Sequence, residues 1–178
     1  MLTHQIKAVE PHLKKGLINH MKKSNLTKQK ERFASLGIDL TKYQKPNAFN
    51  KNFIRFGKGA DNEDVVFILL QNGEECIVDQ TDYYRHQLGR YYWSKDHTDP
   101  SRGYVSCWIE TSPSDGKTNN KRHILIQYII KDVTFGADGE YVIDHINHNH
   151  LDNRLSNLRK ATKCANARNR TNGKGALI

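Results

Sequence analysis

The chain has 178 residues, a net charge of +9 and 37% apolar residues, which suits one ordinary domain or two very small ones with a modest core. It contains no run of 18 apolar residues and opens with no apolar signal sequence, so neither a membrane span nor export is expected. Three widely spaced cysteines, Cys76, Cys107 and Cys164, form no pattern typical of a disulfide framework or a paired zinc knuckle. We therefore expect the protein to remain in the reducing cytoplasm.

The charge is unevenly distributed along the chain. Residues 1–58 carry 13 Lys and Arg against 3 Asp and Glu, residues 59–153 carry 8 against 16, and residues 154–178 carry 7 against none. Basic clusters of this kind favour a polyanionic partner such as nucleic acid. Two solvated basic tails would explain the same pattern, so charge alone leaves both interpretations open.

The first part of the chain has the periodicity of one or two amphipathic helices between Thr3 and Leu36, with Gly16 and Gly37 as breaks. The stretch from Asn47 to Asn62 is rich in asparagine and contains glycine, so it is typical of a linker. We place a domain boundary near residue 60, between a basic helical segment (1–58) and a β-rich region with the functional motif (59–178). The apolar residues of the helical pattern are Ile6, Val9, Leu13, Leu17, Ile18 and Met21.

Further elements are predicted between residues 65 and 130. Residues 65–70 and 76–78 flank an Asn72-Gly73 pair, which predicts a β-hairpin. A short helix over 79–92, a strand over 104–109 and a polar loop over 111–120 follow. The apolar run 123–130 fits a buried helix or a strand, because periodicity does not separate the two, and we favour the helix.

The next segment carries residue types suited to hydrolysis. Tyr141-Val142-Ile143 predicts a strand leading into Asp144-His145, a carboxylate beside an imidazole. Neighbours on a strand point to opposite faces, so the strand must end or bend there if both residues serve one site. Turn formers follow at residues 147–150, and a helix is expected from Lys163 with Thr162 as its N-cap.

These residues form a pattern that resembles the HNH endonucleases of phages and introns. The similarity is carried by Asp144-His145-Ile146-Asn147, by the run from Leu151 to Arg159, and by Ala161-Thr162 with Asn166 and Asn169. It covers residues 122–170, with weaker similarity back to residue 65. An isolated Asp-His pair more often caps a turn, so the resemblance depends on the surrounding pattern.

The resemblance implies a ββα-metal fold, in which a hairpin and a helix hold one divalent ion, Mg²⁺ or Mn²⁺. By motif position, Asp144 and Asn166 would bind the metal, His145 would be the general base, and Asn157 would hold the hairpin loop and so the base. An imidazole that titrates near pH 6.5 can take a proton from water. The expected products carry a 5′-phosphate and a 3′-hydroxyl.

Basic residues around the motif are expected to bind the phosphates of double-stranded DNA, which gives affinity rather than sequence preference. The aromatic cluster between residues 83 and 93 would stack on bases or, as is commoner, form core. An alternative metal site would use zinc, bound by His145, His148, His150 and Cys164. The predicted DNA-binding residues are Arg154, Arg159, Lys160, Lys163, Arg168 and Arg170.

Together these patterns predict an α+β protein with a basic helical N-terminal segment, a β-rich middle region and a C-terminal ββα-metal motif. The predicted function is a metal-dependent endonuclease that nicks or cuts double-stranded DNA, as a phage homing endonuclease in the cytoplasm of a bacterial host. Two alternatives are a restriction endonuclease of the same chemistry and a DNA-binding regulator that no longer cuts.

Overall fold

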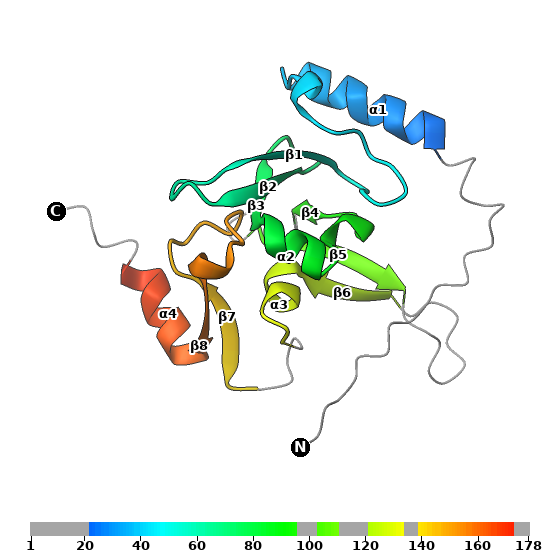
Figure 1. Cartoon of the computed structure of the whole chain (residues 1–178). Coiled ribbons are helices and arrows are strands. Elements are labelled where there is room, and N and C mark those ends of the chain that lie inside the picture. Colours follow the sequence, from blue (N-terminus) through cyan, green and yellow to red (C-terminus); the bar gives the residue numbers. More distant parts are fainter. Residues whose placement is uncertain (1–21, 96–102, 111–120, 134–138, 173–178) are drawn as a thin grey trace, which may run out of the picture. The chain divides into compact units, whose positions relative to one another are not determined.

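The computed structural model describes residues 22–95, 103–110, 121–133 and 139–172 (Figure 1). The chain divides into two compact units, residues 1–38 and 39–178. The sequence placed the boundary near residue 60 instead. Strands β1 (Phe53–Lys58) and β2 (Asp64–Leu69) lie on either side of that position and pair antiparallel over their whole length. A boundary at residue 60 would therefore separate two paired strands.

The described part of the first unit is helix α1 (Lys22–Ser35). It ends as the sequence predicts, since Gly37 has a φ of +71° that suits glycine. The Ile38 N–H donates to the Phe33 carbonyl and the Gly37 N–H donates to the Ala34 carbonyl, both at 3.0 Å, which closes the last turn. The apolar residues that predicted an earlier amphipathic helix lie outside the described residues, so that expectation stays a prediction.

The second unit begins with a short 3-10 helix, η1 (Leu40–Lys42), and a sheet of order β1-β2-β3. The hairpin of β2 and β3 (Glu75–Asp79) confirms the predicted one, and Gly73 in its turn has a φ of +89°. The linker expected over residues 47–62 is wrong in part. β1 lies inside it because Phe53 and Ile54, each 2% exposed, pair with β2 and bury apolar surface.

The middle of the chain contains helix α2 (Gln80–Arg85), the 3-10 helix η2 (Leu88–Arg90) and a second antiparallel sheet of order β4-β5-β6. Its strands are β4 (Ser94–Lys95), β5 (Val105–Glu110) and β6 (Lys121–Leu125). Helix α3 (Ile126–Ile130) follows β6 directly. The helix predicted over 123–130 is therefore half correct. The first residues extend the sheet against β5, and only the last five turn into a helix.

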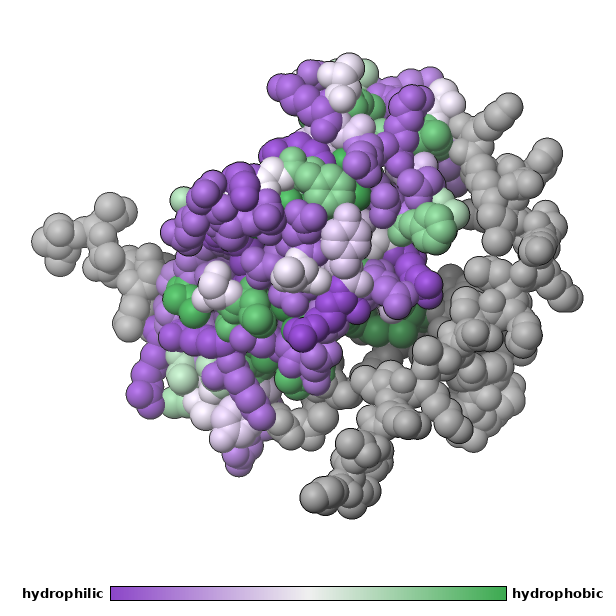
Figure 2. Space-filling view, in the orientation of Figure 1, coloured by the Kyte–Doolittle hydropathy of each residue, from purple (hydrophilic) through white to green (hydrophobic). Residues whose placement is uncertain are grey.

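Most of the large apolar residues form one core between the elements of the second unit. Trp93 is 1% exposed and Tyr83 3%, so these two aromatics are core residues, whereas Tyr84 is 58% exposed. On the face drawn in Figure 2, hydrophilic residues cover most of the described surface and apolar residues appear in small separate areas. No helix among the described residues is long and apolar enough to cross a membrane.

The chain ends in strand β7 (Tyr141–His145), the 3-10 helix η3 (Leu155–Asn157), strand β8 (Leu158–Thr162) and helix α4 (Lys163–Asn172). The predicted N-cap is confirmed, because the Thr162 hydroxyl accepts a hydrogen bond from the Ala165 N–H at 3.1 Å. In Figure 1, α4 lies against the β7–β8 hairpin, and the loop that joins the two strands reaches the sheet of β1, β2 and β3. The predicted site residues lie on this hairpin and helix.

Candidate active site

The hairpin fixes the two residues predicted to carry the chemistry. β7 and β8 pair antiparallel, so that Asp144 lies opposite Arg159 and His145 lies opposite Leu158. Asp144 is 7% exposed and His145 is 2% exposed. β7 ends at His145, which is where the sequence requires the strand to end or bend.

The carboxylate of Asp144 receives all of its hydrogen bonds on one oxygen. Arg159 donates from Nε and Nη2 to Oδ2 at 3.0 and 2.8 Å, and Asn169 donates from Nδ2 to the same oxygen at 2.9 Å. Within the described part of the chain, Oδ1 accepts no hydrogen bond. The buried polar atoms without a partner in that part do not include Oδ1, so this oxygen is exposed to solvent. These donors hold the carboxylate in one orientation and leave Oδ1 free to act as a ligand.

The α4 residue that contacts Asp144 is Asn169, whereas the sequence predicts Asn166 as the second metal ligand. Residues three apart on a helix share a face, and both asparagines are half-buried on the face of α4 that turns toward the hairpin. The Asn166 side chain makes no hydrogen bond to the residues that the structure describes. Asn169 therefore orients the Asp144 carboxylate, and the role of Asn166 as a metal ligand stays a prediction.

The imidazole of His145 is surrounded by polar and aromatic groups. Its Nε2 lies 3.1 Å from Asn153 Oδ1, and its ring centroid lies 5.9 Å from that of Tyr104 and 5.2 Å from that of His150. Burial is the main cause that lowers the pKa of His145 to about 4, and the hydrogen bond with Asn153 opposes this shift. The ring is therefore uncharged at neutral pH and has a lone pair that can accept a proton.

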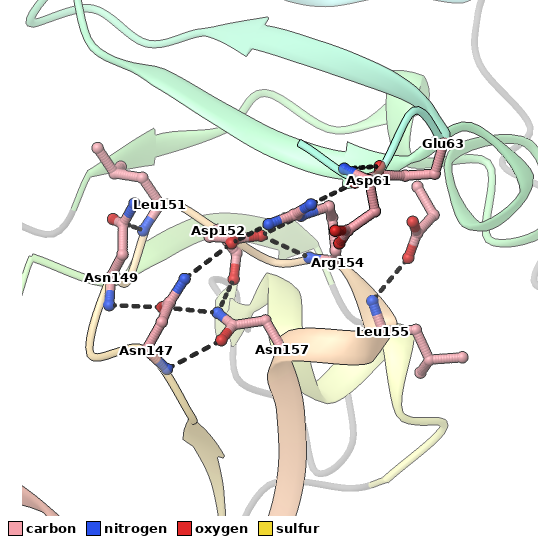
Figure 3. Close-up of polar contacts among 10 residues, drawn as sticks. Asp61, Glu63, Asn147, Asn149, Leu151, Asp152, Arg154, Leu155 and Asn157 are labelled. Carbon is pink, nitrogen blue, oxygen red and sulfur yellow. Dashed lines mark hydrogen bonds and ion pairs between the residues drawn. The ribbon is translucent and has the colours of Figure 1, made fainter. Parts of the chain in front are cut away.

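Asn157 ties together the two ends of the loop between β7 and β8 (Figure 3). Its Oδ1 accepts a hydrogen bond from the Asn147 N–H at 3.0 Å, and its Nδ2 donates to Asn147 Oδ1 at 2.9 Å and to the Asp152 carbonyl at 2.7 Å. Its own carbonyl accepts a hydrogen bond from the Ile146 N–H at 2.9 Å. These are the contacts of a residue that holds the loop, and its importance for catalysis stays a prediction.

The same loop is also joined to β3, far away in the sequence. The Ile77 N–H donates to the Leu151 carbonyl at 2.8 Å, and the Asn153 N–H donates to the Ile77 carbonyl at 2.8 Å. Ile77 and Asp152 thereby form a short parallel bridge. The first sheet thus supports the loop that follows His145.

Arg154, one of the predicted DNA-binding residues, is held by two carboxylates. Its Nε and Nη2 donate to Asp152 at 2.8 and 2.7 Å, and its Nη1 pairs with Glu63 in the turn between β1 and β2 (Figure 3). The two carboxylates raise the pKa of Arg154 above its ordinary value, mainly through the hydrogen bonds with Asp152. Its side chain is 15% exposed and connects the loop to the first sheet, and its contact with DNA stays a prediction.

His148 occupies a backbone position that favours glycine. Its φ is +63°, and its N–H donates to the His145 carbonyl at 3.1 Å in a tight turn.

The zinc alternative is not supported here: among the described residues, no three His, Cys, Asp or Glu side chains gather closely enough to hold a metal ion. His150 stacks on Tyr104 with ring centroids 4.2 Å apart.

The remaining predicted DNA-binding residues lie along β8 and α4. Lys160, Lys163 and Arg168 are exposed, and Arg159 is 44% exposed beside Asp144. The side chain of Arg170 lies outside the described residues. Arg159 thus lies beside Asp144, whereas Lys160 lies opposite Ile143 and points to the other face of the hairpin. Phosphate binding by these cations stays a prediction.

Residues 135–168 match the family model described as HNH endonuclease. This segment is an HNH endonuclease domain. The resemblance found in the sequence is thereby confirmed, and the HNH domain indicates nuclease activity. No curated protein and no solved structure matches the chain.

HNH nucleases generally use a divalent metal ion, and the groups beside Asp144 suit one. Asp144 Oδ1 and the amide oxygen of Asn166 take part in no hydrogen bond within the described part of the chain. Oxygen ligands favour Mg²⁺ or Mn²⁺ over zinc. Arg159 meets only Oδ2, so it stabilises the ionised carboxylate without covering the other oxygen.

Sequence reasoning missed three residues of this site. Tyr104 and Asn153 flank the imidazole of His145, and Asn169 holds Asp144. Asn153 and Asn169 belong to the motif that carried the resemblance, but nothing in their spacing indicates which atoms they contact. Tyr104 directly precedes β5 of another sheet, and nothing in the sequence indicated its place beside His145.

Proposed function

We propose that this protein is a divalent-metal-dependent endonuclease that hydrolyses a phosphodiester bond of double-stranded DNA. One observation carries the proposal: the HNH domain holds a buried imidazole next in sequence to a carboxylate, one oxygen of which makes no hydrogen bond to the described residues. Hydrolysis of a phosphodiester requires a base for the attacking water and positive charge at the phosphoryl oxygens. His145 suits the first task, and a divalent ion held by Asp144 would supply the second.

The proposed roles follow the contacts of each side chain. His145 takes a proton from the attacking water, and Asn157 holds the loop next to it. Asp144 and Asn166 would hold Mg²⁺ or Mn²⁺, and Asn169 keeps the Asp144 carboxylate in position. When bound, such an ion neutralises the phosphoryl oxygens and stabilises the leaving oxygen. The products carry a 5′-phosphate and a 3′-hydroxyl.

The proposed DNA partner is bound through its phosphates by Arg159, Lys160, Lys163, Arg168 and Arg170. Their charge supports this role, because the last 25 residues contain seven Lys and Arg and no acid. The basic N-terminal segment, residues 1–58, is proposed as an accessory DNA-binding element. Its share of the salt dependence of binding can be measured by replacing Lys28, Lys30 and Arg32 of α1 with glutamine.

Within this chemistry we propose a free-standing phage homing endonuclease that acts in the cytoplasm of a bacterial host. The resemblance to the HNH endonucleases of phages and introns supports this choice. The deciding experiment incubates the protein with plasmid and phage DNA, with and without Mg²⁺, and sequences the ends. One rare site is expected, whereas many short palindromic sites would identify a restriction enzyme.

The control for this experiment compares two buried histidines. His145→Ala is expected to abolish cleavage, because it removes the proposed base. His86→Ala removes a side chain of which 9% is exposed and which contacts Asp82 and Asp132, so cleavage should persist in folded protein. Binding without cleavage by the wild type under every divalent metal would replace the proposal with the non-cleaving regulator.

A further inference from the structure

Asn153 is 0% exposed, and both polar atoms of its side chain have partners. Its Nδ2 donates to the His150 carbonyl at 3.0 Å and to Cys76 Sγ at 3.5 Å. Its Oδ1 lies 3.1 Å from His145 Nε2. A buried amide with these neighbours can adopt only one of its two orientations.

The His150 carbonyl decides that orientation. A backbone carbonyl only accepts hydrogen bonds, so the amide nitrogen of Asn153 must face it and the amide oxygen must face His145. Since Oδ1 is also only an acceptor, the proton of this pair must be on His145 Nε2. The neutral imidazole is thereby held as the Nε2–H tautomer, with the lone pair on Nδ1.

The other ring nitrogen is in a position to use that lone pair. Nδ1 of His145 makes no hydrogen bond to the described residues. The buried side-chain nitrogen and oxygen atoms without a partner in the described part of the chain are His86 Nε2 and Gln127 Oε1, and Nδ1 is not among them. Water can therefore reach Nδ1, while Asn153 closes the other side of the ring.

The first sheet fixes Asn153 itself. The Asn153 N–H donates to the Ile77 carbonyl at 2.8 Å, and Cys76, the neighbour of Ile77 in β3, accepts a hydrogen bond from its side chain. Tyr104 and His150 pack beside the imidazole with ring centroids 5.9 and 5.2 Å away. The position of the histidine thus depends on residues about 70 places earlier in the chain.

We propose that Asn153 is a positioning residue for the nuclease reaction, which sets the tautomer of His145 so that Nδ1 is the atom that takes the proton from water. The inference rests on the proposed function, because it gives His145 the role of general base. It also makes β3 part of the catalytic apparatus through Cys76 and Ile77. Asn153 touches neither water nor DNA in this role and acts only through the imidazole.

The tautomer can be measured without any activity assay. The ¹⁵N chemical shifts of His145 in protein labelled with ¹⁵N-histidine distinguish a protonated from an unprotonated ring nitrogen, and comparison with His145→Gln assigns the signals. We expect a protonated Nε2 and an unprotonated Nδ1 in the metal-free wild type above neutral pH. A protonated Nδ1 would overturn the proposal, whether or not the protein cleaves DNA.

Two variants test the consequence for the reaction. Asn153→Ala removes the acceptor and is expected to lower kcat about 10- to 100-fold with an unchanged KM, since the base is disturbed and the DNA-binding surface is not. Asn153→Asp keeps an acceptor facing Nε2 but loses the donor to the His150 carbonyl, so it should lower stability yet retain the tautomer and a larger share of kcat. Equal loss in both variants, with the tautomer retained in both, would show a structural role only.

Asn52→Ala is the matched control. Asn52 is also buried, at 5% exposure, and its side chain binds backbone groups of Leu69 and Trp93. Its removal should lower stability but leave the His145 tautomer and the kcat of the folded protein unchanged. If the wild type cleaves no DNA, the proposed function fails while the tautomer is still measured. If it cleaves and Nδ1 is protonated, the positioning proposal fails alone.

Discussion

Asn157 and Asn147 bind each other twice: Asn157 Oδ1 accepts from the Asn147 N–H at 3.0 Å, and Asn157 Nδ2 donates to Asn147 Oδ1 at 2.9 Å. The pair joins the two ends of the loop between β7 and β8, directly after His145. Asn157 is 7% exposed and its hydrogen bond to the Asp152 carbonyl is buried, so water does not replace that bond when the side chain is lost, whereas Asn147 is exposed.

Asn157→Ala should therefore destabilise the protein by about 2–4 kcal/mol and greatly reduce cleavage. Denaturant unfolding and a cleavage assay measure the two effects. Amide hydrogen exchange at Asn147 and Ile146 should become faster. Asn149→Ala serves as the control, because within the described residues the Asn149 side chain accepts a single exposed hydrogen bond, from the Leu151 N–H. If Asn149→Ala cost as much as Asn157→Ala, the loop-holding role of Asn157 would be wrong.

Arg154 and Lys160 should respond differently to substitution. Arg154→Met leaves the buried carboxylate of Asp152 unpaired, and we expect a loss of about 3 kcal/mol in the free energy of unfolding. Lys160→Gln should leave stability nearly unchanged but lower the slope of log affinity for DNA against log salt by about 1. Fluorescence anisotropy with labelled duplex DNA at several salt concentrations measures the slope. A reduced slope in folded Arg154→Met would show that Arg154 also contacts DNA.

His148→Gly is expected to be tolerated or stabilising. A residue with a side chain at a φ of +63° is strained by roughly 1 kcal/mol, and glycine relieves this while adding some entropy to the unfolded chain. A melting temperature equal to or above that of the wild type is expected. His150→Gly should lower it instead, because His150 stacks on Tyr104. A clear loss of stability in His148→Gly would mean that its ring makes a contribution larger than the strain.

Stability should depend on pH through His145. Burial lowers the pKa of this group from 6.5 to about 4, so the unfolded chain binds more protons than the folded one between these values. The contribution of the uncharged His145 to the free energy of unfolding is complete above pH 6.5. It is lost as the pH falls toward 4, and the loss is at most on the order of 3 kcal/mol. Urea unfolding in the presence of a chelator measures it. His145→Gln should show a shallower dependence in this window, and an unchanged slope would contradict the shift.

The two asparagines of α4 should differ in their response to metal. Asn166→Ala removes a proposed ligand, so we expect cleavage to require about 10-fold or more Mg²⁺. Asn169→Ala removes one of the three hydrogen bonds to Asp144 Oδ2 and should have a smaller effect on the Mg²⁺ requirement. A chelator should abolish cleavage by all forms. If Asn169→Ala had the larger effect on the metal requirement, Asn169 would replace Asn166 as the proposed ligand.

The sequence by itself determined those features that depend on neighbouring residues. The hairpin of β2 and β3 follows from apolar runs on either side of Asn72-Gly73, and α4 begins where Thr162 can cap it. The motif from Asp144 to Asn169 was sufficient to indicate an HNH endonuclease. In each case the information lies within a few residues of the element, because turns, caps and side-chain periodicity are local properties.

Only the tertiary structure decided which distant groups meet. Residues 53–58 form strand β1 because they pair with β2. Residues 121–125 form a strand that pairs with β5, and the helix begins where this pairing ends. Arg154 pairs with Glu63, which lies 91 residues away in the sequence. Asn169 met Asp144, and Asn153 met both His145 and Cys76. A charged or amide side chain has several possible partners, and packing of the whole chain selects among them.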